Sequence, residues 1–164
     1  MNPHGITIAR ILPLEVARVE EFATTPDEVD AELRPFFEEE AKAAMEAIET
    51  ALQAWDAENS REPLKMLRHH FHTLKGAANS IGHVRIGALA SGMEEICNQF
   101  NPAYAFVLRS QIIKTCITVL LTIQLLMEEA RQPQFCAIKK EDLIKAAHCI
   151  SDLQERGREL QGAA

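Results

Sequence analysis

Aromatic residues, glycine and proline are scarce in this chain of 164 residues. Aromatic side chains make up 5% of the sequence, and there are 7 glycines and 7 prolines. Because 47% of the residues are nevertheless hydrophobic, the core must be built mainly from aliphatic side chains and alanine. Few residues break helices and many favour them, so the composition predicts a soluble, all-α protein with one main domain.

Positive charge is also in short supply. The chain has 17 lysines and arginines against 24 acidic residues, which gives a formal net charge of -7. An acidic surface repels phosphate backbones, so we expect no nucleic-acid partner. The longest apolar run, residues 115–127, is shorter than the roughly 20 residues that a membrane span needs. It therefore predicts a buried core helix and no membrane association.

Several signatures of other protein classes are missing. The cysteines form no CxxC pair and match no zinc spacing, so we expect free thiols in a reducing, cytoplasmic compartment and no metal. No basic segment followed by an apolar core marks a signal peptide at the N-terminus. Neither GxG nor GxxxxGK[ST] occurs, so the sequence predicts no nucleotide site and no enzyme activity of its own. The chain could still have been cut from a longer histidine kinase.

Apolar residues recur at helical spacing through most of the chain. The predicted helices are residues 30–57, 61–80, 84–99, 102–131 and 140–160. In the first of these, Pro35 indicates a kink or a later start, and Ser60 is a plausible N-cap for the second. The apolar stripe of the first is Leu33, Phe37, Ala44, Ile48, Leu52 and Trp55.

The short connections between these helices predict antiparallel neighbours. We expect an antiparallel four-helix bundle with an additional C-terminal helix, formed by residues 26–164. Residues 1–25 are interpreted as an N-terminal extension or linker, in which Pro13 could open a short helix.

The second predicted helix carries a polar face around His72. At about 100° per residue, positions three and four apart share a face of a helix. Phe71 and Leu74 point the other way, into the bundle, so His72 should project into solvent. The residues that share its face are Lys65, Arg68, His69, Lys75, Gly76 and Asn79.

The residues on this face could act together in a chemical reaction. A solvent-facing imidazole is a good nucleophile near neutral pH. Lys75 lies one turn away and can pair with the negative charge of a phosphoryl group. Gly76 costs roughly 0.5–1 kcal/mol relative to alanine inside a helix, and it removes a side chain where a partner's backbone would approach. Taken alone, His72 could still be an ordinary surface histidine.

The segment FHTLKGAANSIG resembles the signature of histidine-containing phosphotransfer domains. That signature is roughly His-x-Leu-Lys-Gly with a second glycine six residues later, and the sequence matches it at His72, Leu74, Lys75, Gly76 and Gly82. Residues 31–52 and 89–96 are similar to the first and third helices of the phosphoryl-accepting domain of chemotaxis-type histidine kinases. The resemblance covers about residues 30–130, and the fifth helix also fits the chemotaxis-type version.

The resemblance implies that His72 carries a phosphoryl group on Nε2, received from a histidine kinase or a receiver domain and passed to a receiver aspartate. It implies that Lys75 assists with the phosphoryl charge. It also implies that Glu94 holds the Nδ1–H of His72, with Glu95 as the competing assignment because the phase of that helix is uncertain. No cofactor is expected on this chain, and Mg²⁺ is expected on the partner response regulator.

The basic strip beside His72 is expected to bind the partner. Its residues, together with the second glycine of the signature, are Lys65, Arg68, His69, Asn79 and Gly82. Two other readings stay open. A metal-binding bundle would need Glu-x-x-His pairs, which the sequence lacks. A helical adaptor or dimerisation bundle without phosphorylation would use the same fold, with the apolar fourth helix as a dimer face.

Overall fold

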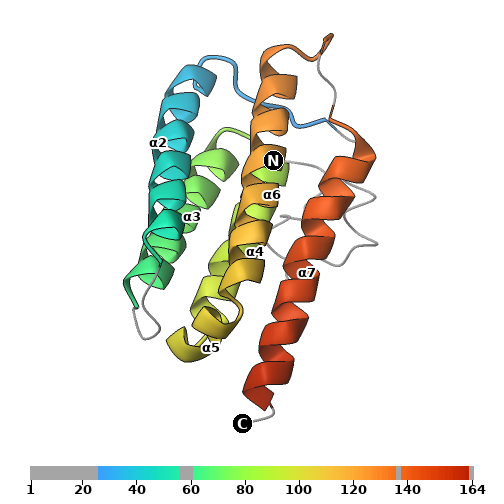
Figure 1. The fold of residues 1–164 in the computed structure, drawn as a ribbon. Helices are drawn as coiled ribbons and strands as arrows, with labels where there is room; N and C mark the ends of the chain where they lie inside the picture. Colours follow the sequence, from blue (N-terminus) through green and yellow to red (C-terminus); the bar gives the residue numbers. More distant parts are fainter. Residues whose placement is uncertain (1–25, 56–60, 136–137, 163–164) are drawn as a thin grey trace.

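The computed structural model describes residues 26–55, 61–135 and 138–162, and these ranges are entirely helix, turn and loop. The helices are α2 (Arg34–Gln53), α3 (Glu62–Ser80), α4 (Val84–Gln99), α5 (Pro102–Val107), α6 (Arg109–Arg131) and α7 (Lys140–Gly162). The long helices run side by side and alternate in direction, with α4 behind α6 in the view of Figure 1. This confirms the predicted all-α bundle with an additional C-terminal helix. The short helix expected in residues 1–25 lies outside the described residues.

Helix α2 starts later than predicted. The Asp30 carboxylate accepts hydrogen bonds from the backbone N–H groups of Glu32, at 2.9 Å, and Leu33, at 3.2 Å, which forms a turn before the helix. Pro35 then occupies the first turn, where its missing N–H costs little. The helix therefore begins after residue 30, which confirms the later start that Pro35 indicated. The inward position predicted for Leu33 was wrong, because this residue precedes the helix and is 45% exposed.

Helix α3 follows its predicted stripe closely. Leu64, Leu67, Phe71, Leu74 and Ala78 are all buried, because this side of the helix packs against both α2 and α4. The helix begins after Arg61, which is the N-cap residue, and Pro63 again stands in the first turn. The N-cap of α3 is thus Arg61; Ser60, the predicted N-cap, lies outside the described residues.

Gly82 makes the tight turn between α3 and α4 possible. Its φ of +90° belongs to the left-handed region that favours glycine. The N–H of His83 donates to the carbonyl of Ala78 at 2.9 Å, which closes the end of α3. A Cβ at residue 82 would lie 2.2 Å from the backbone oxygen of Glu28, so the turn also accommodates the segment that leads into α2.

The single helix predicted from Pro102 to Arg131 is two helices. Asn101 caps the first, accepting from the N–H of Ala103 at 3.0 Å, and α5 ends at Val107. The chain turns at Leu108, whose side chain is buried in the core. Arg109 then reaches the segment just after α2, where its guanidinium donates to the carbonyl of Trp55 at 2.9 Å. The burial of Leu108 and the hydrogen bond of Arg109 stabilise the turn between α5 and α6.

Helix α4 is surrounded, with α3 on one side and α6 and α7 on the others. Its residues 85–93 are all buried, which explains its small and apolar side chains. Helix α6 has the length and composition of a membrane span, yet half of its most apolar window is buried inside the bundle. This is the pattern of a core helix. The predicted stripe of α7, which is Leu143, Ala147, Ile150 and Leu153, is buried as well.

Candidate functional site

His72 stands on the outer side of a firmly anchored helix. Its neighbours Phe71 and Leu74 are fully buried, so they fix the rotation of α3 about its axis. The side chain of His72 is 66% exposed as a result. A partner protein can therefore reach the imidazole without any opening of the bundle.

Glu94 reaches His72 from α4. Its Oε1 lies 2.8 Å from Nδ1 of His72, and its Oε2 lies 2.6 Å from Nζ of Lys75. Glu95, the competing assignment, instead accepts a hydrogen bond from Gln99 on its own helix at 2.8 Å. One carboxylate thus contacts both the imidazole and the lysine of the His-x-x-Lys-Gly motif.

The contact determines which imidazole nitrogen is free. Burial of Glu94 opposes its ionisation, but the hydrogen bonds from Lys75 and His72 outweigh this and lower the pKa of the carboxyl. An ionised carboxylate can only accept hydrogen bonds, so Nδ1 must carry the proton of a neutral imidazole. Nε2 then keeps its lone pair, as a nucleophile requires.

The basic residues on this face differ in how their charges are balanced. Lys75 is paired with Glu94, and Lys65 forms a solvent-exposed pair with Glu62 at 3.8 Å. Arg68 donates from Nη1 to Oδ1 of the neutral Asn98 at 3.3 Å.

The remaining predicted residues are spread along the same helix and the turn after it. His69 is exposed and packs edge-on against His70, with the ring centroids 5.0 Å apart. Asn79 is exposed and lies further along α3, where its amide rests against the backbone of Gly87 in α4. Gly82 has a conformational reason to be glycine, and its predicted part in partner binding stays a prediction.

Within the described part of the chain, Gly76 has no packing reason to be glycine. It follows Lys75 on the exposed side of α3, and a Cβ built on it would meet no described atom within 4 Å. Its backbone is helical, with no positive φ. Space above the helix is therefore open at this position, one turn from His72.

Gly87 was missed by the sequence reasoning. A Cβ at this position would lie 2.0 Å from Oδ1 of Asn79, so any side chain here would require the Asn79 amide to move. Glycine lets α4 approach α3 closely at the end of the bundle beyond Glu94. No motif marks this glycine in the sequence, because its partner is set only by the pairing of the two helices.

A buried charged network was also missed. Arg85, on the first turn of α4, donates from Nε to Oδ2 of Asp27 at 3.2 Å and from Nη2 to the carboxylate of Glu129 on α6. Glu129 also accepts from the N–H of Ile138 at 3.0 Å. His83 lies beside Asp27, with Nδ1 3.7 Å from Oδ2, and is 1% exposed. The network ties four separate segments together at the start of α4.

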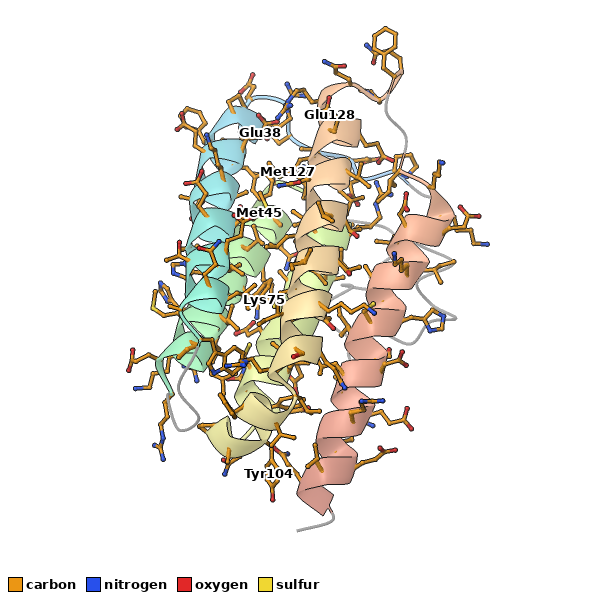
Figure 2. The ribbon with its side chains drawn as sticks, viewed as in Figure 1. Glu38, Met45, Lys75, Tyr104, Met127 and Glu128 are labelled. Atoms are coloured by element: carbon orange, nitrogen blue, oxygen red, sulfur yellow. The ribbon has the colours of Figure 1, made fainter. Side chains whose placement is uncertain are left out.

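In the part of the chain that the structure describes, no cluster of three or more His, Cys, Asp or Glu residues could hold a metal ion. A groove runs between α2 and α6, where Glu38 and Met45 face Met127 and Glu128 (Figure 2). None of its lining residues belongs to the helices that carry His72 and Glu94.

Comparison with known families identifies the class of protein. The family model of the Hpt domain matches residues 32–133, which is more than half of the chain. The chain therefore belongs to the Hpt domain family, the histidine phosphotransfer modules of two-component phosphorelays. Its general role is that of a phosphotransfer carrier in a phosphorelay. Neither a curated protein nor a solved structure matches the chain.

Proposed function

We propose that His72 is the phosphoryl-carrying residue of this chain. It would accept the group from a histidine kinase or from the aspartyl phosphate of a receiver domain, and it would donate the group to a receiver aspartate. The observation that carries the proposal is the contact of Glu94 with Nδ1, because it leaves Nε2 as the free nucleophile on the exposed side of α3. Such a carrier works in the cytoplasm, where kinases and response regulators meet.

The bonds and charges of the transfer step are accounted for by His72, Glu94 and the receiver aspartate. The lone pair of Nε2 attacks phosphorus, a P–N bond forms, and the P–O bond to the receiver aspartate breaks to release a carboxylate. The imidazole becomes positively charged, and its Nδ1–H stays hydrogen-bonded to Glu94. The reverse step regenerates the neutral imidazole. No proton leaves the ring in either direction, so Glu94 supports the charge of the ring in both.

Lys75 supports the charge of the phosphoryl group in this scheme. Its ammonium lies on the helix one turn after His72, and the pairing with Glu94 holds the flexible side chain beside the ring. The chain supplies the nucleophile and these polar groups, while Mg²⁺, where the reaction uses it, belongs to the receiver. We therefore propose no cofactor on this chain.

The partner is proposed to dock over the exposed face of α3. Gly76 leaves open space beside His72, which lets the backbone of a receiver come close. Lys65, Arg68 and His69 border the same surface, and all three are exposed. A strip of positive charge in a protein of net charge -7 favours the acidic rim around a receiver aspartate.

The test is phosphoryl transfer from a receiver domain that has been charged with a small phosphodonor. We expect the wild-type chain to take up an acid-labile, base-stable label and the His72→Gln variant to take up none. Circular dichroism should show equal helicity, because His72 is exposed and holds no part of the core. Label on the folded His72→Gln variant would overturn the assignment of His72. A folded wild-type chain that stays unlabelled by several receivers and kinases would favour the adaptor function.

A further inference from the structure

Arg68 lies one turn before His72 on the exposed side of α3. Its guanidinium crosses to α4, where Nη1 donates to Oδ1 of Asn98 at 3.3 Å. Arg68 and His72 are four residues apart on α3, and Asn98 and Glu94 are four residues apart on α4. The two contacts therefore lie on the same seam between antiparallel helices, one helical turn from each other.

The charge of Arg68 is not balanced by a carboxylate. Lys75 is paired with Glu94, so part of its charge is already offset by a carboxylate before any phosphoryl group arrives. In the described part of the chain, Arg68 forms no ion pair, and its one polar partner is a neutral amide. Arg68 is thus the cation of the site whose charge is still available.

The hydrogen bond to Asn98 holds the guanidinium beside α4. Cys97 lies between Glu94 and Asn98 in sequence and is buried at the α4 side of the seam. Burial is the main cause that raises the pKa of its thiol to about 12; the Glu94 carboxylate contributes to this rise, and the charge of Arg68 opposes it.

We propose that Arg68 is the second cation that binds the phosphoryl group on His72, and that Asn98 is the residue that positions it. The inference rests on the proposed function and adds a ligand for the group that His72 carries. A guanidinium has five N–H donors, and Asn98 engages one of them. The remaining donors can reach phosphoryl oxygens, because side chains four residues apart on a helix are neighbours.

The test uses the full chain, phosphorylated chemically with phosphoramidate so that no partner protein is needed. The ³¹P signal that is absent from His72→Gln identifies the phosphoryl group on His72, and its chemical shift is followed against pH. A nearby cation stabilises the more highly charged form, so Arg68→Gln should raise the apparent pKa of the phosphoryl group by about half a unit or more. Lys65→Gln is the matched control, since Lys65 is also exposed on this face but is already paired with Glu62.

Two substitutions at Asn98 distinguish the effect of the position of the Arg68 guanidinium from the effect of its charge. Asn98→Ala removes the acceptor, so it should raise the apparent pKa of the phosphoryl group by less than Arg68→Gln does. When Arg68 is already replaced by glutamine, Asn98→Ala should leave the apparent pKa of the phosphoryl group unchanged. Asn98→Asp keeps an acceptor in place but neutralises the guanidinium, so it should act as strongly as Arg68→Gln. All of these residues are on the surface, so the helicity of each variant should equal that of the wild type.

The outcomes separate this inference from the proposed function. A His72-dependent signal with the same apparent pKa in wild type and Arg68→Gln would overturn the role of Arg68 and leave the carrier function standing. Equal shifts from Arg68→Gln and Lys65→Gln would show a general field effect and also overturn it. An effect of Asn98→Ala that persists without Arg68 would overturn the positioning role. A folded wild-type chain without any His72-dependent signal would contradict the proposed function, and this inference with it.

Discussion

Nδ1 of His72 lies 2.8 Å from Oε1 of Glu94, across the interface between α3 and α4. The contact links the exposed imidazole of His72 to a helix that is buried on almost every side. Because α4 cannot rotate freely in such an environment, the carboxylate has a fixed place relative to the ring. The bundle thereby determines which imidazole nitrogen faces the partner.

Replacing Glu94 by glutamine should slow phosphorylation of His72. The neutral amide cannot stabilise the charged ring as a carboxylate does, and it releases Lys75 from its ion pair. We expect a decrease of about tenfold or more in the rate of transfer from a charged receiver. Glu95→Gln is the matched control, because Glu95 contacts only its neighbour Gln99 among the described residues. Equal rates for the two variants would contradict the role of Glu94.

The contact between Glu94 and His72 should survive mild acid. Burial opposes ionisation of the Glu94 carboxyl, but the hydrogen bonds from Lys75 and His72 outweigh it and lower the pKa of this carboxyl below its usual value. A carboxyl whose pKa is lowered by folding contributes stability above its unfolded pKa, and this stability is lost as the pH falls through the folded pKa. A ¹³C NMR titration should therefore show the Glu94 carboxyl protonating at lower pH than an ordinary glutamate side chain. Protonation of Glu94 at the ordinary pH of a glutamate would show that the ion pair is too weak to matter.

A side chain at residue 76 should not disturb folding, but a large one should hinder docking of the receiver. No described atom lies within 4 Å of a Cβ at this position, so Gly76→Ala should stabilise the helix by about 0.5–1 kcal/mol. Gly76→Leu should fold as well but raise the receiver concentration needed for half-maximal transfer. Chemical denaturation and transfer kinetics on the two variants measure these effects. Unchanged transfer in Gly76→Leu would show that the partner approaches elsewhere.

Arg85 should be needed for stability rather than for transfer chemistry. It is 3% exposed and pairs with both Asp27 and Glu129, so Arg85→Met leaves two buried carboxylates without their cation. We expect a loss of about 3–5 kcal/mol in the free energy of unfolding. Urea denaturation measures the loss. Arg109→Met is the comparison, since it removes an arginine whose hydrogen bond is to a backbone carbonyl. A loss no larger than in this variant would contradict the importance of the buried network.

Much of the site could be predicted because it is local to one helix. The stripe through Leu67, Phe71 and Leu74 determines which side of α3 is buried, and so places His72 outside. The same reasoning failed where side-chain contacts decide where a helix begins or ends. Leu33 has helical spacing but precedes the helix, because the Asp30 side chain forms a turn there. Leu108 breaks a continuous helical pattern through burial of its own side chain.

The buried network could not have been predicted at all. Arg85 and its partners Asp27 and Glu129 are separated by 58 and 44 positions in the chain. No periodicity relates residues so far apart, and a charged residue in an otherwise apolar helix would be assigned to the surface. The pairing of Asn98 with Arg68 is of the same kind, since it depends on the register between α3 and α4.

The most direct test of the central claim is the atom that carries the phosphoryl group. The wild-type chain, labelled with ¹⁵N in its histidines and charged by a phosphorylated receiver, can be studied by long-range ¹H–¹⁵N correlation. We predict that one histidine changes, that it is the one missing in His72→Gln, and that phosphorus is bonded to Nε2 while Nδ1 keeps its proton. Phosphorus on Nδ1 of His72, or on another histidine such as His69, would contradict the account.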